Sequence, residues 1–366
     1  MTKQPDPVAE AIEAFKRGEI VVVTDDTDRE NEGDLIVAAV HATPEKIGFI
    51  VRHTTGIVCA PMPRDSARRL QLQPMVADND APLGTAFTVS VDFRHGMTTG
   101  ISAEERCNTI RALANANVGA ADFVRPGHVF PLIARDGGVL MRSGHTEAAV
   151  DLCRLADLEP VGVLAELVND DGTVKRGADV VHFAEEHKLR LVSVAELIAW
   201  RQRSEKLVER VADFPVSTDA GPAHAYTYHL PYDATQHLAL VYGDIGDGHG
   251  VPVRLHRESV IDDVFGADSV LNRVVHQLAR GGRGVIVYLR EGSVGVASES
   301  VRARDIASST DSPPTREDEW REVGLGAQIL RDLGVKSIRL IASRERHYVG
   351  LDGFGIEIET TDIIDR

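Results

Sequence analysis

IVVVTDDTDRENEGDLIV, residues 20–37, places a mostly polar decapeptide between two apolar runs. Six of the ten residues at 25–34 are carboxylates, and the decapeptide also contains Arg29. Charges at the end of a buried strand cost free energy unless they face water, a cation or a polar ligand. The decapeptide is therefore either a solvated acidic turn, which is the usual meaning of a charge run, or a sharp excursion that presents oxygen ligands and a guanidinium at one place. An EF-hand loop beginning at Asp28 is excluded because its twelfth residue would be Ala39.

The size and charge of the chain limit its class. A length of 366 residues exceeds what one hydrophobic core usually supports, which predicts two domains. A formal net charge of −16 argues against a nucleic-acid partner and against an acidic membrane surface. The three cysteines cannot all pair, and the N-terminal residues lack the basic and apolar regions of a signal peptide. No apolar run is long enough to span a membrane, so we expect a cytoplasmic protein.

Periodicity and capping residues predict helices that alternate with strands. Strands are expected at 19–24, 89–93 and 161–164, the second with exposed polar neighbours between its apolar side chains. Helices are expected at 7–17, from Pro44 to about Val51, and after Ser102 and His145. This alternation predicts the α/β (α+β) class.

The domain boundary is expected where a long helix turns polar. Ser193 begins a capping box, and the helix after it is predicted to run through Trp200 towards Val211. The polar run at 201–206 puts the boundary near residue 203, which gives domains 1–203 and 204–366. The second domain should contain strands at 239–242, 284–289 and 337–342 and a helix near 327–333.

A second candidate site motif is RSGHTE at 142–147. A glycine turn that enters a helix leaves unpaired N–H groups directed at one spot, and Arg142 and Thr146 suit that spot to a phosphate. His145 can bind a divalent cation or move a proton, although a capping turn with a surface histidine explains the same residues. His128, in a rigid turn, and Glu166, after an apolar run, are further candidates. A solvated strand end is the alternative for Glu166.

Several long motifs occur in the order of one known family. They are DDTDRENEGDLI (25–36), RHTTGIVCAPM (52–62), TTGISAEER (98–106), the run 125–152 and GVLAELVNDDGT (162–173). Through them residues 6–202 resemble 3,4-dihydroxy-2-butanone 4-phosphate synthase, the riboflavin-pathway lyase. The resemblance implies that ribulose 5-phosphate is converted to the four-carbon butanone phosphate and formate, with Mg²⁺ or Mn²⁺ as cofactor. It also implies a homodimer with sites at the subunit interface.

The same resemblance implies roles for individual residues. Glu30 and His145 are expected to hold the metal, and His128 and Glu166 are expected to serve the acid–base steps. The residues expected to bind the substrate are Arg29, Glu30, Asp34, Arg142, Ser143, Gly144, His145, Thr146 and Glu166. Enediol formation from a ketose needs a base and a cation that stabilises the developing oxyanion, which accounts for these residue types. Cys59 is expected to be an inert thiol, whereas Asp25, Asp26, Asp28 and Glu32 have no assigned role.

Residues 204–366 resemble GTP cyclohydrolase II, a family that opens the GTP ring with a zinc ion held by three cysteines. The matching segments include RLHRESVIDDVFG (254–266) and GLGAQILRDLGVKSIRLIAS (324–343). Ser259 stands where the first zinc cysteine belongs, and Val270 and Asn272 fall at the other two positions. Such side chains are weak zinc ligands or none, so zinc is not expected.

Other positions of this second half also depart from the cyclohydrolase family. The GTP-contacting segment is shortened at 291–296, and Arg304 aligns with the family's tyrosine. Arg321 keeps an arginine position, with Glu319 in place of an aspartate. We expect a folded domain without the cyclohydrolase activity, kept for stability, dimer assembly or ligand binding. The alternatives are a bifunctional enzyme with unusual ligands and a regulatory protein in which both halves have lost their chemistry.

Overall fold

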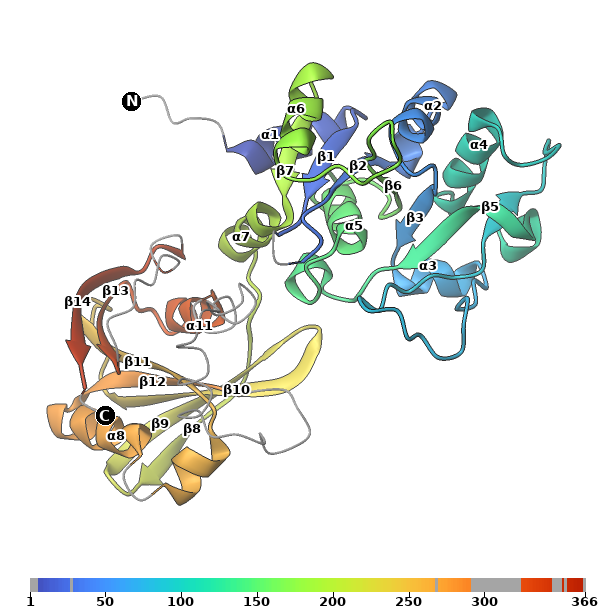
Figure 1. Cartoon of the computed structure of the whole chain (residues 1–366). Coiled ribbons are helices and arrows are strands. Elements are labelled where there is room, and N and C mark those ends of the chain that lie inside the picture. The colour runs from blue at the N-terminus through green and yellow to red at the C-terminus, as the bar shows by residue number, and fades with distance from the viewer. Residues whose placement is uncertain are drawn as a thin grey trace. The chain divides into compact units, whose positions relative to one another are not determined.

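The computed structural model describes residues 6–26, 29–266, 269–290, 324–343, 351 and 354–364. The chain divides into two compact units, Met1–Arg201 and Gln202–Arg366. Each unit contains one mixed seven-stranded sheet, which confirms the predicted α/β class (Figure 1). Within the described residues, no helix has the length and apolar character needed to cross a membrane.

The first unit has the strand order β4-β5-β3-β6-β2-β1-β7. Its strands are β1 (Val21–Thr24), β2 (Gly33–Ala38), β3 (Cys59–Met62), β4 (Val91–Phe93), β5 (Phe123–Ile133), β6 (Gly162–Glu166) and β7 (Arg190–Ser193). Its helices are α1 (Pro7–Lys16), α2 (Pro44–His53), α3 (Arg64–Arg69), α4 (Ala103–Leu113), α5 (His145–Leu155), α6 (Ala178–Glu186) and α7 (Val194–Ser204).

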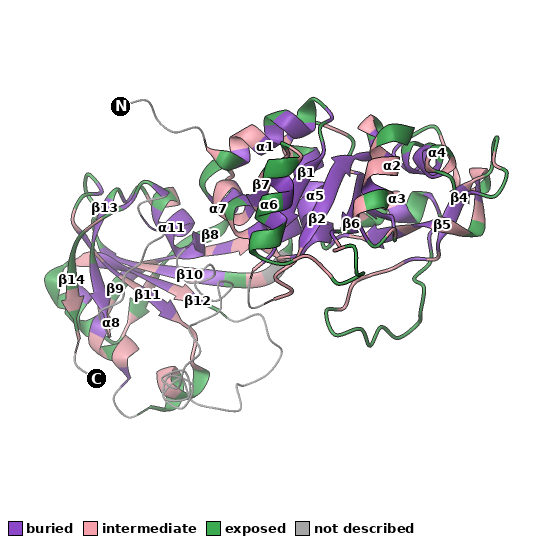
Figure 2. Ribbon diagram, turned by 45° about the horizontal axis from the view of Figure 1, so that its top comes forward, coloured by how far each residue is buried: buried purple, intermediate pink, exposed green. Residues whose placement is uncertain are grey.

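Helices cover both faces of this sheet, and the two faces form separate cores. Leu35 and Val37 of β2 face a core shared with α2, α3, α4 and α6. Ile36 and Ala38 face the other core, which is shared with α1, α5 and α7. A strand buried on both faces reads as a continuous apolar run, and Figure 2 shows β2 as buried along its visible length.

The capping residues start helices where the sequence predicts them. Thr43 caps α2 by accepting the Lys46 N–H at 3.3 Å. Ser102 and Glu105 form both bonds of a capping box at the start of α4. Each such cap satisfies N–H groups that the first helical turn leaves unpaired.

The prediction of a helix from Val194 towards Val211 is wrong in its second half. Helix α7 ends at Ser204, and Val211 lies in the strand β8 (Glu209–Thr218). Strand β8 pairs with β9 (Gly221–Leu230) as an antiparallel hairpin. Pairing with the next strand therefore replaces the helical continuation that the residue pattern favoured.

The expectation of exposed polar neighbours in the strand at 89–93 is also wrong. Ser90 is 9% exposed and Asp92 is 2% exposed. Both accept hydrogen bonds from β5: the Gly127 N–H bonds to the Ser90 hydroxyl at 3.1 Å, and the His128 N–H bonds to Asp92 at 2.9 Å. Buried polar groups are tolerated when they are paired in this way.

A buried ion pair joins α7 to α5. Arg201 lies in the polar run used to predict the domain boundary, yet it is 7% exposed. It donates to Asp151 at 2.8 Å and to the Gly137 carbonyl at 2.7 Å. Asp151 also accepts the Val139 N–H at 2.8 Å. Burial raises the pKa of Asp151, and Arg201 opposes that rise.

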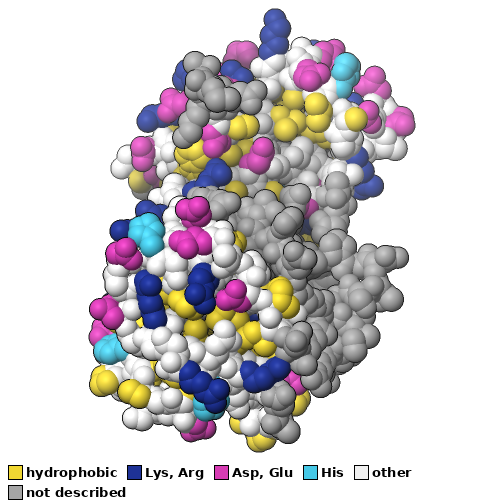
Figure 3. All heavy atoms as spheres, turned by 90° about the vertical axis from the view of Figure 1, so that its left-hand side faces the viewer, with side chains coloured by type: hydrophobic (Ala, Val, Ile, Leu, Met, Phe, Trp, Pro, Cys, Tyr) yellow, Lys and Arg dark blue, Asp and Glu magenta, His cyan; other side chains and the backbone are white. Residues whose placement is uncertain are grey.

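The second unit has the strand order β14-β13-β11-β12-β10-β9-β8. Its further strands are β10 (Asp233–Gly243), β11 (Val251–Arg257), β12 (Arg283–Leu289), β13 (Ser337–Ala342) and β14 (Glu357–Ile363), and its helices include α8 (Val270–Gly281) and α11 (Leu325–Asp332). The three predicted strands and the predicted helix fall in β10, β12, β13 and α11. Figure 3 shows basic side chains interspersed with acidic ones over the described surface of one face.

Candidate active site

The acidic loop between β1 and β2 is organised by its first carboxylate. Asp25 is 8% exposed. It accepts Arg29 Nη1 at 2.9 Å, the Glu30 N–H at 3.0 Å and the Glu32 N–H at 2.8 Å. An aspartate that follows a strand can fold a loop around itself through such bonds. The loop is therefore not a fully solvated turn, and Asp25, which had no predicted role, shapes it.

Asp25, Glu30 and His145 form the group of potential metal ligands that the described residues contain. One ligand atom from each lies within 4.8 Å of the others. The loop supplies the two carboxylates, and the first turn of α5 supplies the histidine. The structure thus brings together the predicted ligands Glu30 and His145 and adds Asp25.

The state of His145 suits a ligand. The residue is 7% exposed, and its Nε2 has no hydrogen-bond partner among the described residues. Burial lowers its pKa, which favours the neutral imidazole, while a hydrogen bond to the Val23 backbone acts in the opposite direction. A neutral imidazole with one ring nitrogen anchored and the other open is the usual form of a metal-binding histidine. Two carboxylates and one imidazole fit Mg²⁺ or Mn²⁺.

Two further carboxylates lie beside this group. Asp34 on β2 pairs in register with Glu166 on β6. Burial, and then the negative charge of Glu166, raise the pKa of Asp34 well above its usual range. Glu166 is exposed in the single chain, but partial desolvation by surrounding protein, followed by Glu32 and Glu30, raises its pKa as well. Carboxyl groups with raised pKa values can hold and release protons near neutral pH.

His128 faces the same side of the sheet from a more distant strand. Cys59 on β3 lies opposite both Leu164 on β6 and Phe130 on β5. Glu166 comes two residues after Leu164 on β6, and His128 comes two residues before Phe130 on β5. Because alternate residues of a strand share a face, both side chains project to the face that α5 covers. Since neighbouring strands are about 4.8 Å apart, His128 lies roughly 10 Å from Glu166 across β3.

The first turn of α5 offers an anion site next to the acidic loop. Gly144 is the N-cap and provides no side-chain cap, so the N–H groups of the first turn remain available. Arg142 precedes the cap and is held by Glu147 at 2.7 Å and by the Thr85 hydroxyl at 3.1 Å. A Cβ on Gly144 would lie 2.5 Å from Arg142 Nη1. The turn therefore packs tightly around the guanidinium.

The remaining predicted residues occupy less direct positions. Ser143 is partly exposed beside the cap, and Thr146 is 6% exposed in the first turn. Arg29 pairs with Asp25 and Glu30, so its charge offsets part of the negative charge of the loop. Burial raises the pKa of Cys59, which makes its thiol unreactive. Asp28 lies outside the described residues.

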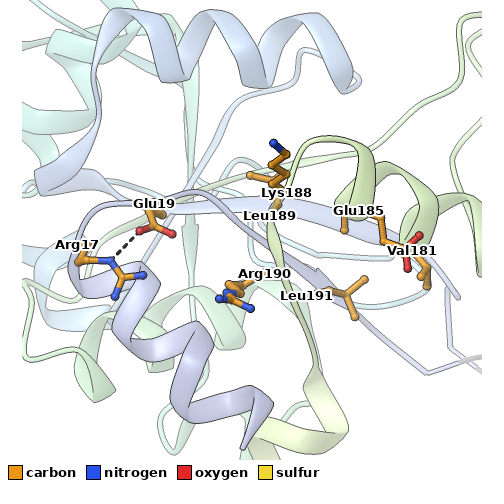
Figure 4. A pocket seen from close by; sticks show the side chains of 9 residues that line it. Arg17, Glu19, Val181, Glu185, Lys188, Leu189, Arg190 and Leu191 are labelled. Atoms are coloured by element: carbon orange, nitrogen blue, oxygen red, sulfur yellow. Dashed lines mark hydrogen bonds and ion pairs between the residues drawn. The ribbon is translucent and has the colours of Figure 1, made fainter. Parts of the chain in front are cut away.

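A separate cavity of about 610 Å³ lies near the C-terminal end of α1, beside α6 and β7. Figure 4 shows Arg17, Lys188 and Arg190 around it. Arg17 pairs with Glu19 at 2.7 Å, and Arg190 pairs with Glu10 at 2.7 Å. Because these acids neutralise two of the three cations, the cavity is not built for an anion.

Ser259, which the resemblance aligns with the first zinc cysteine, lies in a hydrogen-bonded network. The Ser259 hydroxyl donates to Asp262 at 2.8 Å, and its N–H donates to Asp263 at 2.9 Å. Asp263 also bonds to His256 at 2.9 Å and to the Tyr288 hydroxyl at 2.8 Å.

The other two cysteine positions fall on α8, and several predicted departures cannot be placed. Val270 begins the helix, and Asn272 is exposed. The segment 291–296, Arg304, Glu319 and Arg321 lie outside the described residues.

The first unit therefore has the site of a metal-assisted enzyme: carboxylates and a histidine lie beside a helix N-terminus that can receive a phosphate. The chain belongs to the 3,4-dihydroxy-2-butanone 4-phosphate synthase family, whose model matches residues 9–200, and is an enzyme of that class, a lyase of riboflavin biosynthesis. The GTP cyclohydrolase II model matches residues 209–362.

Relatives of known name match nearly the whole chain. The riboflavin biosynthesis protein RibBA of Salinispora arenicola is 47% identical, over 96% of this chain and 87% of the relative. The monofunctional riboflavin biosynthesis protein RIBA 2 of Arabidopsis thaliana, a chloroplastic protein, is also 47% identical, over 96% of this chain and 75% of its own length.

One solved structure matches nearly the whole chain, and another matches about half of it. RibBX, a two-domain 3,4-dihydroxy-2-butanone 4-phosphate synthase from A. baumannii, is 37% identical with a TM-score of 0.83, over 98% of this chain and 99% of its own. A 3,4-dihydroxy-2-butanone 4-phosphate synthase in complex with two magnesium ions is 44% identical with a TM-score of 0.53, over 54% of this chain and 97% of its own.

Proposed function

We propose that the first unit converts ribulose 5-phosphate to 3,4-dihydroxy-2-butanone 4-phosphate and formate with Mg²⁺ or Mn²⁺. The observation that carries this proposal is the group formed by Asp25, Glu30 and His145, whose ligand atoms lie within 4.8 Å of one another. Glu30 and His145 would hold the cation, and a solved relative described in complex with two magnesium ions is consistent with magnesium as the metal. Asp25 would keep the loop closed around it.

The proton transfers are assigned to groups around this centre. When bound, the cation would stabilise the oxyanion that develops as the ketose becomes an enediol. Glu166 would remove a carbon-bound proton, and Asp34 would hydrogen-bond to the substrate. His128 faces the same side of the sheet and would serve the later proton transfers. Arg142, Ser143, Gly144 and Thr146 would bind the phosphate at the start of α5.

The full chain should release formate from ribulose 5-phosphate in the presence of Mg²⁺. Removal of the metal with EDTA should abolish the release, and added Mg²⁺ or Mn²⁺ should restore it, because the oxyanion loses its cation. A coupled formate dehydrogenase assay measures the rate. Formate release that persists in metal-free buffer would contradict the metal assignment, and no release with either metal would contradict the substrate.

We further propose that the second unit lacks GTP cyclohydrolase activity. Serine, valine and asparagine at the three cysteine positions support this, because none supplies a thiolate. The Ser259 hydroxyl is moreover committed to Asp262. The names of two relatives, one called monofunctional and one called a two-domain synthase, are consistent with it. The second candidate is a bifunctional enzyme, which the family match over 209–362 favours.

Metal analysis combined with a GTP assay separates these candidates. We expect the purified chain to contain no stoichiometric zinc and to release no formate from GTP, since a thiolate site is missing. A zinc-loaded GTP cyclohydrolase II assayed in parallel controls the detection limit. One equivalent of zinc together with formate release from GTP would establish the bifunctional enzyme instead.

The homodimer and the cytoplasmic location remain part of the proposal. Ile57 and Ile101 are 49% and 51% exposed in the single chain. They lie in the loops before β3 and α4, and a subunit interface over these loops would cover both side chains.

A further inference from the structure

A buried carboxylate holds His128 by two hydrogen bonds. Asp92 lies on β4 and is 2% exposed. Its Oδ1 accepts the His128 backbone N–H at 2.9 Å, and its Oδ2 lies 2.7 Å from His128 Nδ1. An ionised carboxylate only accepts, so Nδ1 carries the hydrogen and Nε2 is left to exchange protons. The imidazole side chain is 42% exposed, which leaves it accessible.

A glycine closes the backbone over this hydrogen bond. Gly100 has φ +86°, and a Cβ there would lie 2.1 Å from Asp92 Oδ2 and 2.9 Å from His128 Nδ1. No larger residue fits without displacing the carboxylate. The loop that carries Gly100 is anchored to α4, because the Thr98 hydroxyl donates to Glu105 at 2.8 Å. Within the motif TTGISAEER, Gly100 therefore packs against the buried Asp92 carboxylate.

Arg106 completes the surroundings of the buried carboxylate. It lies on α4, is 6% exposed, and donates to the Gly56 carbonyl at 3.2 Å. Burial lowers the pKa of Arg106, and the charge of Asp92 opposes that shift. A buried carboxylate needs such a compensating cation.

We propose that Asp92 is a positioning residue that fixes the ring orientation and tautomer of His128, an inference that rests on the catalytic role proposed for His128. The alternative is a purely structural role, in which Asp92 only bonds to the His128 N–H where the β4–β5 register shifts. Asp92→Asn separates the two. An asparagine can keep the Oδ1 bond to that N–H, but its amide directs a donor at Nδ1 and so favours the hydrogen on Nε2.

The test compares kcat and KM for formate release by the full chain with Mg²⁺. We expect Asp92→Asn to lower kcat about 10- to 100-fold and to change KM by less than about threefold. The loss in kcat should be a part of the roughly 10²- to 10⁴-fold acceleration that general acid–base catalysis contributes. NMR of the protein labelled with ¹⁵N-histidine should show the His128 tautomer inverted. His128→Asn identifies its signal by the peak that disappears.

A pair of glycine variants provides the matched control. Gly96 has φ +74° and nothing within 4 Å of its missing Cβ. Gly96→Ala therefore carries the same kind of backbone strain as Gly100→Ala without the collision. We expect Gly100→Ala to lower kcat at least about tenfold, as expected for a displaced acid–base group, and Gly96→Ala to retain it.

A folded Asp92→Asn variant with wild-type kcat would overturn the positioning role. If His128→Asn in that case still abolishes turnover, only the positioning inference fails. If His128→Asn also retains wild-type turnover, the catalytic role of His128 fails with it.

Discussion

Glu30→Gln should lower the turnover of ribulose 5-phosphate by on the order of 10²- to 10³-fold, which is the size of losing one group that stabilises a developing oxyanion. The amide that replaces the carboxylate is neutral and binds a hard cation weakly. Glu30 is also one of the three groups whose ligand atoms lie within 4.8 Å of one another, so its loss leaves Asp25 and His145 alone. Formate release measures the turnover, and calorimetric titration with Mg²⁺ measures the affinity.

Glu13→Gln is the matched control for Glu30→Gln. Glu13 is an exposed glutamate on α1, so the same loss of one negative charge should leave both turnover and Mg²⁺ affinity unchanged. A folded Glu30→Gln protein that releases formate at nearly the wild-type rate would contradict the assignment of Glu30 as a metal ligand.

Asp151→Ala should lower the free energy of unfolding of the first unit by about 3–5 kcal/mol, because it removes one side of the buried ion pair between Asp151 and Arg201. The same change removes the acceptor of the Val139 N–H. Hydrogen exchange of α5 amides in increasing urea measures the effect within this unit, where a single two-state transition for both units cannot be assumed.

A double variant tests whether the charge pair itself stabilises the fold. Burial raises the pKa of Asp151 and Arg201 opposes that rise, so desolvation of the buried pair works against the attraction between the two charges. Asp151→Leu combined with Arg201→Met should recover the part of the loss that comes from the unpaired buried charge, whereas the Val139 N–H still lacks its acceptor. Glu185→Ala, at an exposed position on α6, should change it by less than about 0.5 kcal/mol. A stable Asp151→Ala single variant would show that Arg201 finds another partner.

The sequence predicts the elements whose signals are local. Thr43 and Ser102 start helices through bonds to residues three positions on, and these caps form as expected. The first turn of α5 is predicted from a different local signal, the glycine turn that enters the helix, because Gly144 is the N-cap without a side-chain capping bond. Local chemistry of this kind survives folding because the fold does not need to supply the partner.

Partners that only the folded chain brings together explain what the sequence missed. Asp92 was expected to be exposed, but it is buried because it accepts hydrogen bonds from His128, a partner 36 residues further along the chain. No role was predicted for Asp25, because the N–H groups of Glu30 and Glu32 donate to its carboxylate only after the loop has turned back. The helix expected to reach Val211 failed for a related reason, since β8 exists through its pairing with β9. Hydrogen bonds that depend on strand register cannot be read from a local pattern.

Because Asp34 and Glu166 are paired across β2 and β6, turnover depends on the correct register of these two strands. The pair unites residues from opposite ends of the first unit across β2 and β6. A slip of one residue between these strands would turn Glu166 to the opposite face. Most other residues of β2 and β6 are apolar and buried, so they could form new apolar contacts in the shifted register. During refolding, the recovery of turnover should therefore report correct strand alignment, whereas compaction and secondary structure alone would not.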